Sequence, residues 1–390
     1  MTDATARILL PRRTHFGIGT SQEIVEVVSS FEAKSVFVVT DEGVSKAGLV
    51  APLVGRLEQS SIRVAVFDRA APEPTVECIE EASDALADAR KSDLILSVGG
   101  GSVMDTAKCA NIVHGNGGAI LDYEDGIEGE RRAVKTLLPH VCVPTTAGTG
   151  SEATVWAVFI DPKRRFKTAV QDPRLLADVA ILDPDMTRTM PPRVAASTGM
   201  DALTHAIEAY VSLSANPVTE AFCLEAMRLI SRNLVEAVKN PVNASARTSM
   251  LLASFLAGSA FSNSTVGIVH TLAEALGGFY RMPHGVANAL LLPHVMEFNR
   301  SANPAKFATI AATMGQEVGG LPEAQASGRS VDAVTGLMGR IGLPRELREV
   351  GVRREDFPEL VTMAFKWANV SGNPRTVSED ELMSLYEEAY

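Results

Sequence analysis

Hydrophobic positions in the first half of the chain fall into short unbroken runs, separated by segments with helical spacing. Residues 35–40 (SVFVVT), 63–67 (RVAVF) and 93–98 (DLILSV) are such runs, and turn residues follow each of them. They predict strands that are buried on both faces. Residues 76–91, between the second and third runs, carry apolar side chains at helical spacing. This alternation predicts a parallel, open α/β sheet with right-handed crossovers.

From Pro191 onward the pattern changes, because Gly, Pro and Asn separate successive helical segments and no strand-like runs occur between them. Residues 202–213, 218–238, 244–261 and 330–341 show this helical spacing. We therefore expect two domains, an α/β domain with a parallel sheet over residues 1–190 and an all-α domain over residues 191–390. The length of 390 residues is compatible with two domains.

Charge and composition narrow the function classes. The chain is 46% hydrophobic and 21% charged, as in an ordinary globular protein, and its formal net charge is -11. A nucleic-acid partner is not expected, because binding phosphates needs a basic surface. No apolar stretch reaches the roughly 20 residues that span a bilayer, so we expect no membrane association.

The cysteines and the N-terminus indicate the compartment. Cys78, Cys109, Cys142 and Cys223 are widely spaced and form no C-x-x-C pair, which favours neither a disulfide framework nor a thiolate zinc site. The N-terminal segment lacks the charged start and the long apolar stretch of a signal peptide. We expect a protein of the reducing cytoplasm.

A glycine-rich loop follows the third predicted strand. Gly99, Gly100 and Gly101 open the sequence GGGSVMDTAK, which should begin a helix. Glycines allow the backbone to approach a pyrophosphate closely, and the N–H groups at a helix N-terminus favour an anion. A second polar loop, PTTAGTGSE at residues 144–152, follows an apolar strand at residues 140–143. Both loops could also be tight structural turns, but two of them at strand ends favour a shared nucleotide ligand.

Asp41 ends the first predicted strand. An acidic side chain at this position can accept hydrogen bonds from an adenosine ribose and repels a 2′-phosphate, which favours NAD over NADP. The alternative is an ordinary turn or helix N-cap residue.

The second half of the chain contains a set of potential metal ligands. Asp201 and His205 are spaced i, i+4 in a predicted helix and so share one face. His270 and His284 follow in the same predicted domain, which gives one carboxylate and three imidazoles, a set that holds a divalent transition metal. Such an ion would act as a Lewis acid that lowers the pKa of a bound alcohol. Any one of these histidines could instead be a packed side chain, and we interpret His294 as structural.

Together these segments resemble the iron-containing (group III) alcohol dehydrogenases, the family of lactaldehyde reductase and propanediol dehydrogenase. The resemblance covers nearly the whole chain and rests on a few motifs, namely GGGSVMDTAK, PTTAGTGSE, TGMDALTHAIEAYVS, PHGVANALLLPHVMEFN and SGNPR at residues 371–375. It implies an N-terminal dinucleotide-binding domain, a helical C-terminal metal-binding domain, and a cleft between them in which hydride passes between NAD and a small alcohol or aldehyde.

The resemblance also implies specific site residues. The metal ligands would be Asp201, His205, His270 and His284. The NAD contacts would be Asp41, Gly100, Gly101, Ser102, Asp105, Thr145, Thr146, Thr149 and Lys167. Gly99, the first glycine of the GGGSVMDTAK loop, is expected to contact NAD as well. Fe²⁺ is the usual metal of the family, although such a site also accepts Zn²⁺. We further expect a homodimer or a higher homo-oligomer, as is common in the family.

Three departures from the family limit the transfer, and one of them is Asn369, which occupies a position where some relatives have Cys in the pocket region. Glu274 stands four residues after His270, where several members carry a second histidine; a glutamate there could relay a proton or alter the pocket. Glu73 replaces an Asn that many relatives place beside the cofactor. From their positions in the matching segments, Trp156, Phe159 and Phe261 are expected to select small or apolar substrates.

Other functions stay open at this stage. Within the fold family, the chain could be a reductase for a phosphono-, sugar- or hydroxyacid-type aldehyde, or a zinc-dependent polyol dehydrogenase. Outside it, a metal- or nucleotide-binding module without turnover would retain the same motifs. A purely structural role would require every polar cluster to be accidental.

Overall fold

The computed structural model describes residues 5–89, 91–125, 136–366 and 368–390. The chain forms two compact units, one from Leu10 to Met190 and one from Pro191 to Tyr390 that also includes the N-terminal segment up to Leu9. That segment joins the second unit because Leu9 and Asn263 exchange two hydrogen bonds. The Leu9 N–H donates to Asn263 Oδ1 (2.6 Å), and Asn263 Nδ2 donates to the Leu9 carbonyl (2.8 Å).

A six-stranded parallel sheet forms the centre of the first unit. In spatial order its strands are β1 (Arg13–Phe16), β8 (Val179–Leu182), β5 (His140–Pro144), β4 (Leu94–Gly99), β2 (Ser35–Val39) and β3 (Arg63–Phe67). An antiparallel hairpin of β6 (Trp156–Asp161) and β7 (Phe166–Gln171) forms a second, two-stranded sheet. The parallel sheet and its four predicted strands are confirmed.

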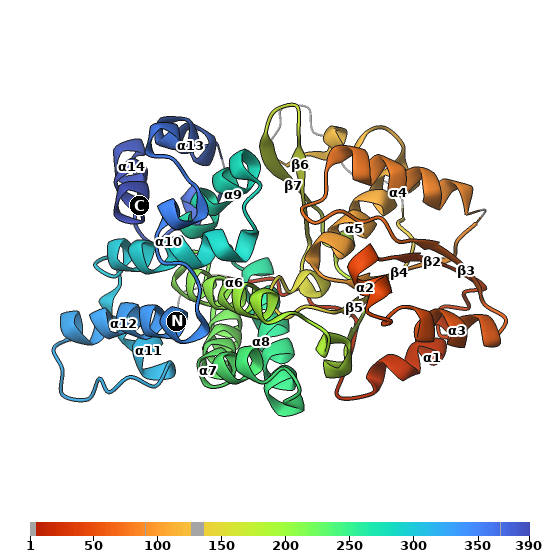
Figure 1. The fold of residues 1–390 in the computed structure, drawn as a ribbon, viewed down its shortest axis with the longest axis horizontal. Coiled ribbons are helices and arrows are strands. Elements are labelled where there is room, and N and C mark those ends of the chain that lie inside the picture. Colours follow the sequence, from red (N-terminus) through yellow and green to blue (C-terminus); the bar gives the residue numbers. More distant parts are fainter. Residues whose placement is uncertain (1–4, 90, 126–135, 367) are drawn as a thin grey trace. The chain divides into compact units, whose positions relative to one another are not determined.

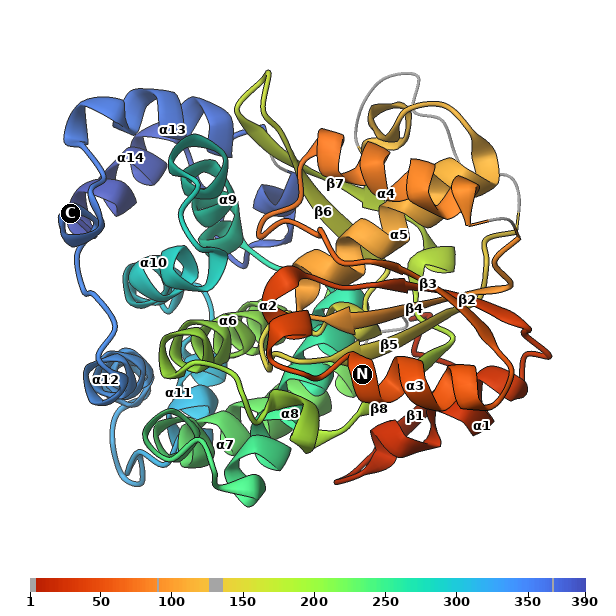
Figure 2. The ribbon, with the colours of Figure 1, turned by 45° about the vertical axis from the view of Figure 1, so that its right-hand side comes forward.

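Helices cover both faces of this sheet, as Figures 1 and 2 show. The helices are α1 (Ile24–Ser29), α2 (Glu42–Lys46), α3 (Ala51–Gln59), α4 (Val76–Asp88) and α5 (Gly101–Asn116). Val36 and Val38 pack with residues of α1 and α3, whereas Phe37 and Val39 pack with residues of α4 and α5. Successive side chains of β2 thus enter opposite layers, which explains its unbroken apolar sequence.

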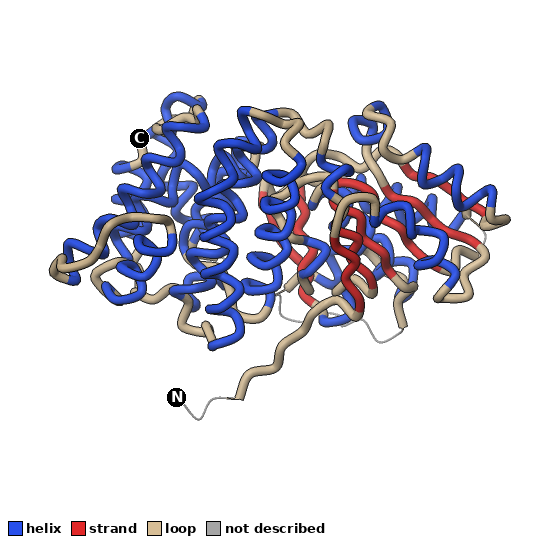
Figure 3. Tube along the Cα trace, turned by 90° about the horizontal axis from the view of Figure 1, so that it is seen from below, coloured by secondary structure: helices blue, strands red, loops and turns tan. Residues whose placement is uncertain are grey.

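The described residues of the second unit form helices joined by loops, and no strand lies among them (Figure 3). Its helices are α6 (Pro192–Val211), α7 (Pro217–Lys239), α8 (Ala244–Ser262), α9 (Ile268–Tyr280), α10 (His284–Asn299), α11 (Pro304–Thr313), α12 (Glu323–Ile341), α13 (Phe357–Ala364) and α14 (Glu379–Glu388). α6 packs against α7, α8 and α10, and α9 packs against α10 and α13. α6 begins ten residues before the predicted segment at 202–213, since Pro192 occupies its first turn, where proline is tolerated.

Short 3-10 helices complete the fold. In the first unit they are Thr20–Glu23, Ile120–Tyr123, Ser151–Ala153, Pro173–Leu175 and Pro184–Thr187, and in the second unit they are Leu347–Val350, Arg354–Asp356 and Ala368–Gly372. No helix among the described residues is long and apolar enough to span a membrane.

Candidate functional site

Helix α6 carries Asp201 and His205 on one face, as their spacing predicts. The helix is buried along most of its length because α7 approaches it closely. A Cβ at Gly199 would lie only 2.2 Å from Leu234 Cδ1 of α7, so the absence of a side chain at this position lets Leu234 pack against α6. Asp201 and His205 are therefore held in the interior, where both are buried.

His270 and His284 reach the same place from the starts of two other helices. His270 lies in the first turn of α9, and His284 is the first residue of α10. A Cβ at Gly285 would lie 2.3 Å from the Ser197 carbonyl oxygen, so the beginning of α10 lies against the backbone of α6. This close approach places His284 beside Asp201.

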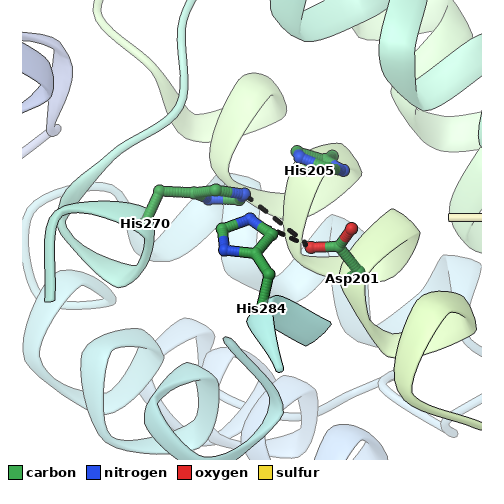
Figure 4. Close-up of side chains that lie close together, drawn as sticks. All are labelled: Asp201, His205, His270 and His284. Carbon is green, nitrogen blue, oxygen red and sulfur yellow. Dashed lines mark ion pairs between the residues drawn. The ribbon is translucent and has the colours of Figure 1, made fainter. Parts of the chain in front are cut away.

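The four side chains form one cluster (Figure 4). One ligand atom from each of Asp201, His205, His270 and His284 lies within 4.8 Å of the others. Asp201 Oδ1 is 3.5 Å from His284 Nε2 and 4.0 Å from His270 Nε2. Ligand atoms around a tetrahedral ion at about 2.1 Å lie roughly 3.4 Å apart, so small side-chain movements suffice to enclose a cation.

Asn288 provides the observation that tests this fit. Its Nδ2 lies 2.7 Å from Asp201 Oδ1, 3.2 Å from His270 Nε2 and 3.1 Å from His284 Nε2. An amide nitrogen has two hydrogens, and three acceptor atoms converge on it. A buried carboxylate and imidazoles whose lone pairs converge on one point are a donor set that suits a divalent cation.

The charges within the cluster shift its pKa values. Burial acts to raise the pKa of Asp201, but His205, His284 and His270 together with the Asn288 hydrogen bond outweigh it, so the pKa is lowered. Burial acts to lower the pKa of His270, but the hydrogen bond and charge of Glu208 outweigh it, so the pKa is raised. The cluster thus keeps its carboxylate ionised in the interior.

Three further predicted residues have different locations. Glu274 is buried beside the cluster, with Oε1 3.7 Å from His284 Nδ1. Phe261 stacks on His205, with ring centroids 4.4 Å apart. Phe159, by contrast, is fully buried in an apolar core with Ile79. The expectation that Phe159 lines a substrate pocket is therefore wrong: it occupies an inward position of β6.

In the first unit, the predicted nucleotide residues follow the carboxyl ends of neighbouring strands. β2 lies between β3 and β4 in the sheet, so the chain leaves β2 in one direction and later continues from β4 in the other. The helices that follow, α3 and α5, cover opposite faces (Figure 2). Open α/β sheets bind ligands at such a switch point. Asp41 follows β2, and Gly100 and Gly101 follow β4.

The two polar loops lie against each other. The Thr145 N–H donates to the Gly99 carbonyl (2.9 Å). A Cβ at Gly101 would lie 2.7 Å from Thr149 Cγ2, and a Cβ at Gly100 would lie 3.1 Å from Thr146 Oγ1. Gly100 caps α5 without a side-chain hydrogen bond. The glycines therefore serve the close approach of the loops, and the structure brings these predicted contacts together.

The other predicted contacts have internal partners. Asp41 caps α2, since its Oδ1 accepts from the Val44 N–H (2.9 Å). Partial burial raises the pKa of Asp105, whose Oδ1 accepts from Ser151 Oγ (2.8 Å). Lys167 Nζ lies 2.7 Å from Glu73 Oε2, and the Glu73 N–H donates to Ser102 Oγ (3.2 Å). Each keeps its predicted cofactor role as a prediction.

The sequence analysis missed the functions of Lys108, Asn288 and Glu208. Buried Lys108 donates to the Ser151 and Thr154 carbonyls (2.7 and 3.0 Å) and so holds the second polar loop; burial lowers its pKa. Helical spacing could have indicated the other two residues. Asn288 is four residues after His284, and Glu208 is three residues after His205.

Comparison with known protein families gives matches to both units. Residues 11–184 match the model of the iron-containing alcohol dehydrogenases, and residues 195–390 match the C-terminal model of the Fe-containing alcohol dehydrogenase family.

Individual relatives are similar to this chain over nearly its full length. The chain is 42% identical to a 1,3-propanediol dehydrogenase of Klebsiella pneumoniae over 386 residues, 98% of each protein. It is 37% identical to an NAD-dependent methanol dehydrogenase of Bacillus methanolicus over 380 residues, 97% of this chain and 98% of the relative. A crystal structure of a 1,3-propanediol oxidoreductase superposes with a TM-score of 0.95 at 40% identity, covering 99% of this chain and all of the other.

Proposed function

The chain belongs to the iron-containing alcohol dehydrogenase family and is a metal-dependent alcohol dehydrogenase linked to NAD, and we propose that it interconverts small primary alcohols and aldehydes at the cluster of Asp201 and three histidines. The observation that carries this proposal is the convergence of four ligand side chains from α6, α9 and α10 on one point. The same residues were predicted from the sequence as the metal ligands.

In this proposal the chain's own residues hold and orient the reactants. A divalent cation, Fe²⁺ or alternatively Zn²⁺, supplies Lewis-acid chemistry that lowers the pKa of an alcohol hydroxyl. Asp201 contributes the ionised oxygen of the ligand set, and His205, His270 and His284 contribute neutral nitrogens. Asp201, His205 and His270 are buried, so the surrounding protein shields their ligand atoms from bulk water.

Phe261 and Glu274 are proposed to shape the substrate site. Phe261 lies flat against His205, so its ring limits the space beside a proposed ligand. Glu274 carries a carboxylate 3.7 Å from the His284 ring, where a proton-accepting group is in reach of the cluster. The names of the relatives, 1,3-propanediol and methanol dehydrogenase, support a small substrate.

The first unit is proposed to bind NAD and the second to bind the metal. The switch point between β2 and β4 supports this assignment, since Asp41 and the glycine loop flank it. The proposed NAD contacts are Asp41, Gly99, Gly100, Gly101, Ser102, Asp105, Thr145, Thr146, Thr149 and Lys167. An acidic Asp41 near the adenosine ribose would disfavour NADP by repelling its 2′-phosphate.

We also propose a homodimer in the cytoplasm. Among the described residues, β1 is an edge strand whose one strand partner is β8, and the large apolar side chains of Leu10, Phe16 and Ile18 on or beside it are exposed. An exposed edge with apolar side chains favours pairing with a second copy. The free, buried cysteines Cys78, Cys109, Cys142 and Cys223 fit a reducing compartment.

A substrate panel tests the proposed function. Metal-free protein is reconstituted anaerobically with Fe²⁺, Zn²⁺ or Mn²⁺, and NADH absorbance is followed with methanol, ethanol, 1,3-propanediol, glycerol and the matching aldehydes. We expect turnover of small primary alcohols with NAD⁺ and at least tenfold lower kcat/KM with NADP⁺. Turnover of only a phosphorylated or sugar aldehyde, or a preference for NADP⁺, would contradict the proposal.

A further inference from the structure

We propose that Glu208 is a positioning residue that fixes the tautomer and the ring orientation of His270, so that the Nε2 lone pair of His270 faces the ligand cluster. The inference rests on the metal site proposed above. It concerns a buried carboxylate on α6 that is not a member of the ligand set.

Both oxygens of Glu208 are engaged at the start of α9. Glu208 Oε2 lies 2.6 Å from His270 Nδ1, and Oε1 accepts the Val269 N–H at 2.7 Å. A carboxylate that accepts from Nδ1 requires the proton on that nitrogen, and in the neutral imidazole that binds a metal this leaves the lone pair on Nε2. His270 Nε2 is the atom that lies 4.0 Å from Asp201 Oδ1 and 3.2 Å from Asn288 Nδ2.

The position of Glu208 couples two helices. Asp201, His205 and Glu208 occupy positions i, i+4 and i+7 of α6 and therefore share one face. α6 thus supplies two proposed ligands and the partner of a third ligand on α9. The Glu208 carboxylate also lies at the N-terminus of α9, where the helix dipole and the Val269 N–H stabilise its negative charge.

Gly267 provides the space for this carboxylate. A Cβ at position 267 would lie 2.9 Å from Glu208 Oε1 and 3.0 Å from Asn373 Oδ1. Gly267 is also the N-cap residue of α9. Any side chain here would displace the carboxylate that contacts His270.

The SGNPR segment at residues 371–375 holds the surroundings of this contact. A Cβ at Gly372 would lie 2.2 Å from Thr265 Cγ2, so the segment lies directly against the turn before α9. The Gly372 carbonyl accepts the Leu213 N–H just after α6 (3.0 Å). Asn373 and Asn299, the last residue of α10, exchange two side-chain hydrogen bonds of 2.8 Å. The motif thereby joins the turn before α9 to the ends of α6 and α10.

Glu208→Gln tests the proposal, because it keeps the size of the side chain and replaces one acceptor oxygen with a donor. If the amide oxygen continues to accept from Val269, the amide nitrogen faces His270 Nδ1 and favours the tautomer with the proton on Nε2. We expect the affinity for Zn²⁺, measured by competition with a chromogenic chelator, to fall 10- to 100-fold, as for other partners of metal-bound histidines. We also expect ¹⁵N-histidine spectra of metal-free protein to show the changed tautomer of His270, identified with His270→Ala.

Two variants serve as controls. Thr204→Val removes a buried hydroxyl on the same helix. Among the described residues, this hydroxyl donates to the Met200 carbonyl alone, so the variant should leave Zn²⁺ affinity unchanged. Gly267→Ala displaces the carboxylate by a second route and should weaken Zn²⁺ binding, even if Glu208→Gln does not fold.

The outcomes separate the two proposals. A Glu208→Gln protein that folds, retains the His270 tautomer and binds Zn²⁺ within threefold of wild type overturns this inference and leaves the proposed function standing. If the wild-type protein itself binds no Zn²⁺ at the cluster, both the proposed function and this inference fail.

Discussion

The ring of Phe261 stacks on the imidazole of His205, with 4.4 Å between their centroids and 18° between their planes. Phe261 belongs to α8, a helix that supplies none of the four proposed metal ligands. Its ring nevertheless lies against one of these ligands, His205. A substrate bound near His205 would meet this ring.

Phe261→Ala should enlarge the substrate site. We expect the ratio of kcat/KM for 1-hexanol over ethanol to rise about tenfold, because apolar contacts of one or two methylene groups carry effects of this size. Phe365→Ala is the control, since that side chain is exposed on the surface. An unchanged ratio in Phe261→Ala would show that Phe261 does not select substrate.

Gly101→Ala should weaken NADH binding. The added Cβ would lie 2.7 Å from Thr149 Cγ2, so it must separate the two polar loops that are proposed to hold the cofactor. We expect about tenfold weaker NADH affinity by fluorescence titration, or about 1.4 kcal/mol. Gly115→Ala, on the same helix, meets only the flexible end of Leu137 at 3.3 Å and the Thr136 carbonyl at 3.7 Å, and should bind NADH normally. Equal affinities for both variants would contradict the loop assignment.

The sheet was predictable because Val36, Phe37, Val38 and Val39 form a short, unbroken and mainly β-branched apolar run, which suits a strand buried on both faces. The edge strand β1 was not, since Arg13–Phe16 is short and largely exposed and lacks a core pattern. The hairpin of β6 and β7 was missed for a related reason, because its strands belong to a small separate sheet.

The grouping of Asp201, His205, His270 and His284 was predictable from residue chemistry, spacing and family resemblance. Helical spacing could have placed Glu208 on the face of Asp201, but its contact with His270, 62 residues away in the chain, could not be predicted. The space that Gly267 provides for this contact likewise follows only from the folded structure. Burial likewise decides that Phe159 belongs to the core, which an aromatic residue in a strand does not reveal.

Gly285→Ala should separate the metal site from the rest of the protein's function. Its Cβ would lie 2.3 Å from the Ser197 carbonyl oxygen, so α10 must move away from α6 and take His284 from Asp201. We expect loss of bound metal, measured by elemental analysis, while NADH binding is retained. Gly336→Ala, in α12, has only the end of Arg340 within reach, at 3.8 Å, and should keep its metal. Full metal content in Gly285→Ala would refute this reading.

Glu152 should make stability depend on pH. Burial raises the pKa of its carboxyl to about 7, so the folded protein favours the protonated form. Its contribution to stability is therefore fully present below about pH 4.5, the ordinary pKa of glutamate, and is lost as the pH rises to about 7.

Glu152→Gln removes this titration. Between pH 4.5 and 8, we expect the unfolding free energy of the variant to rise relative to wild type by about 3 kcal/mol. Denaturant unfolding across this pH range measures the difference, which cancels the titration of the other groups. Parallel pH profiles for the two proteins would contradict the assignment.

The most direct test of the account is metal uptake by the stripped protein, measured together with NADH formation. Protein freed of metal by a chelator should be inactive, should bind one equivalent of Fe²⁺ or Zn²⁺ per chain, and should recover alcohol oxidation in proportion to the metal bound. His270→Ala and His284→Ala should neither bind the metal nor recover alcohol oxidation. His294→Gln, on the same helix as His284, should behave as wild type. Alcohol oxidation by metal-free protein, or one equivalent of metal bound by His284→Ala, would contradict the central claim.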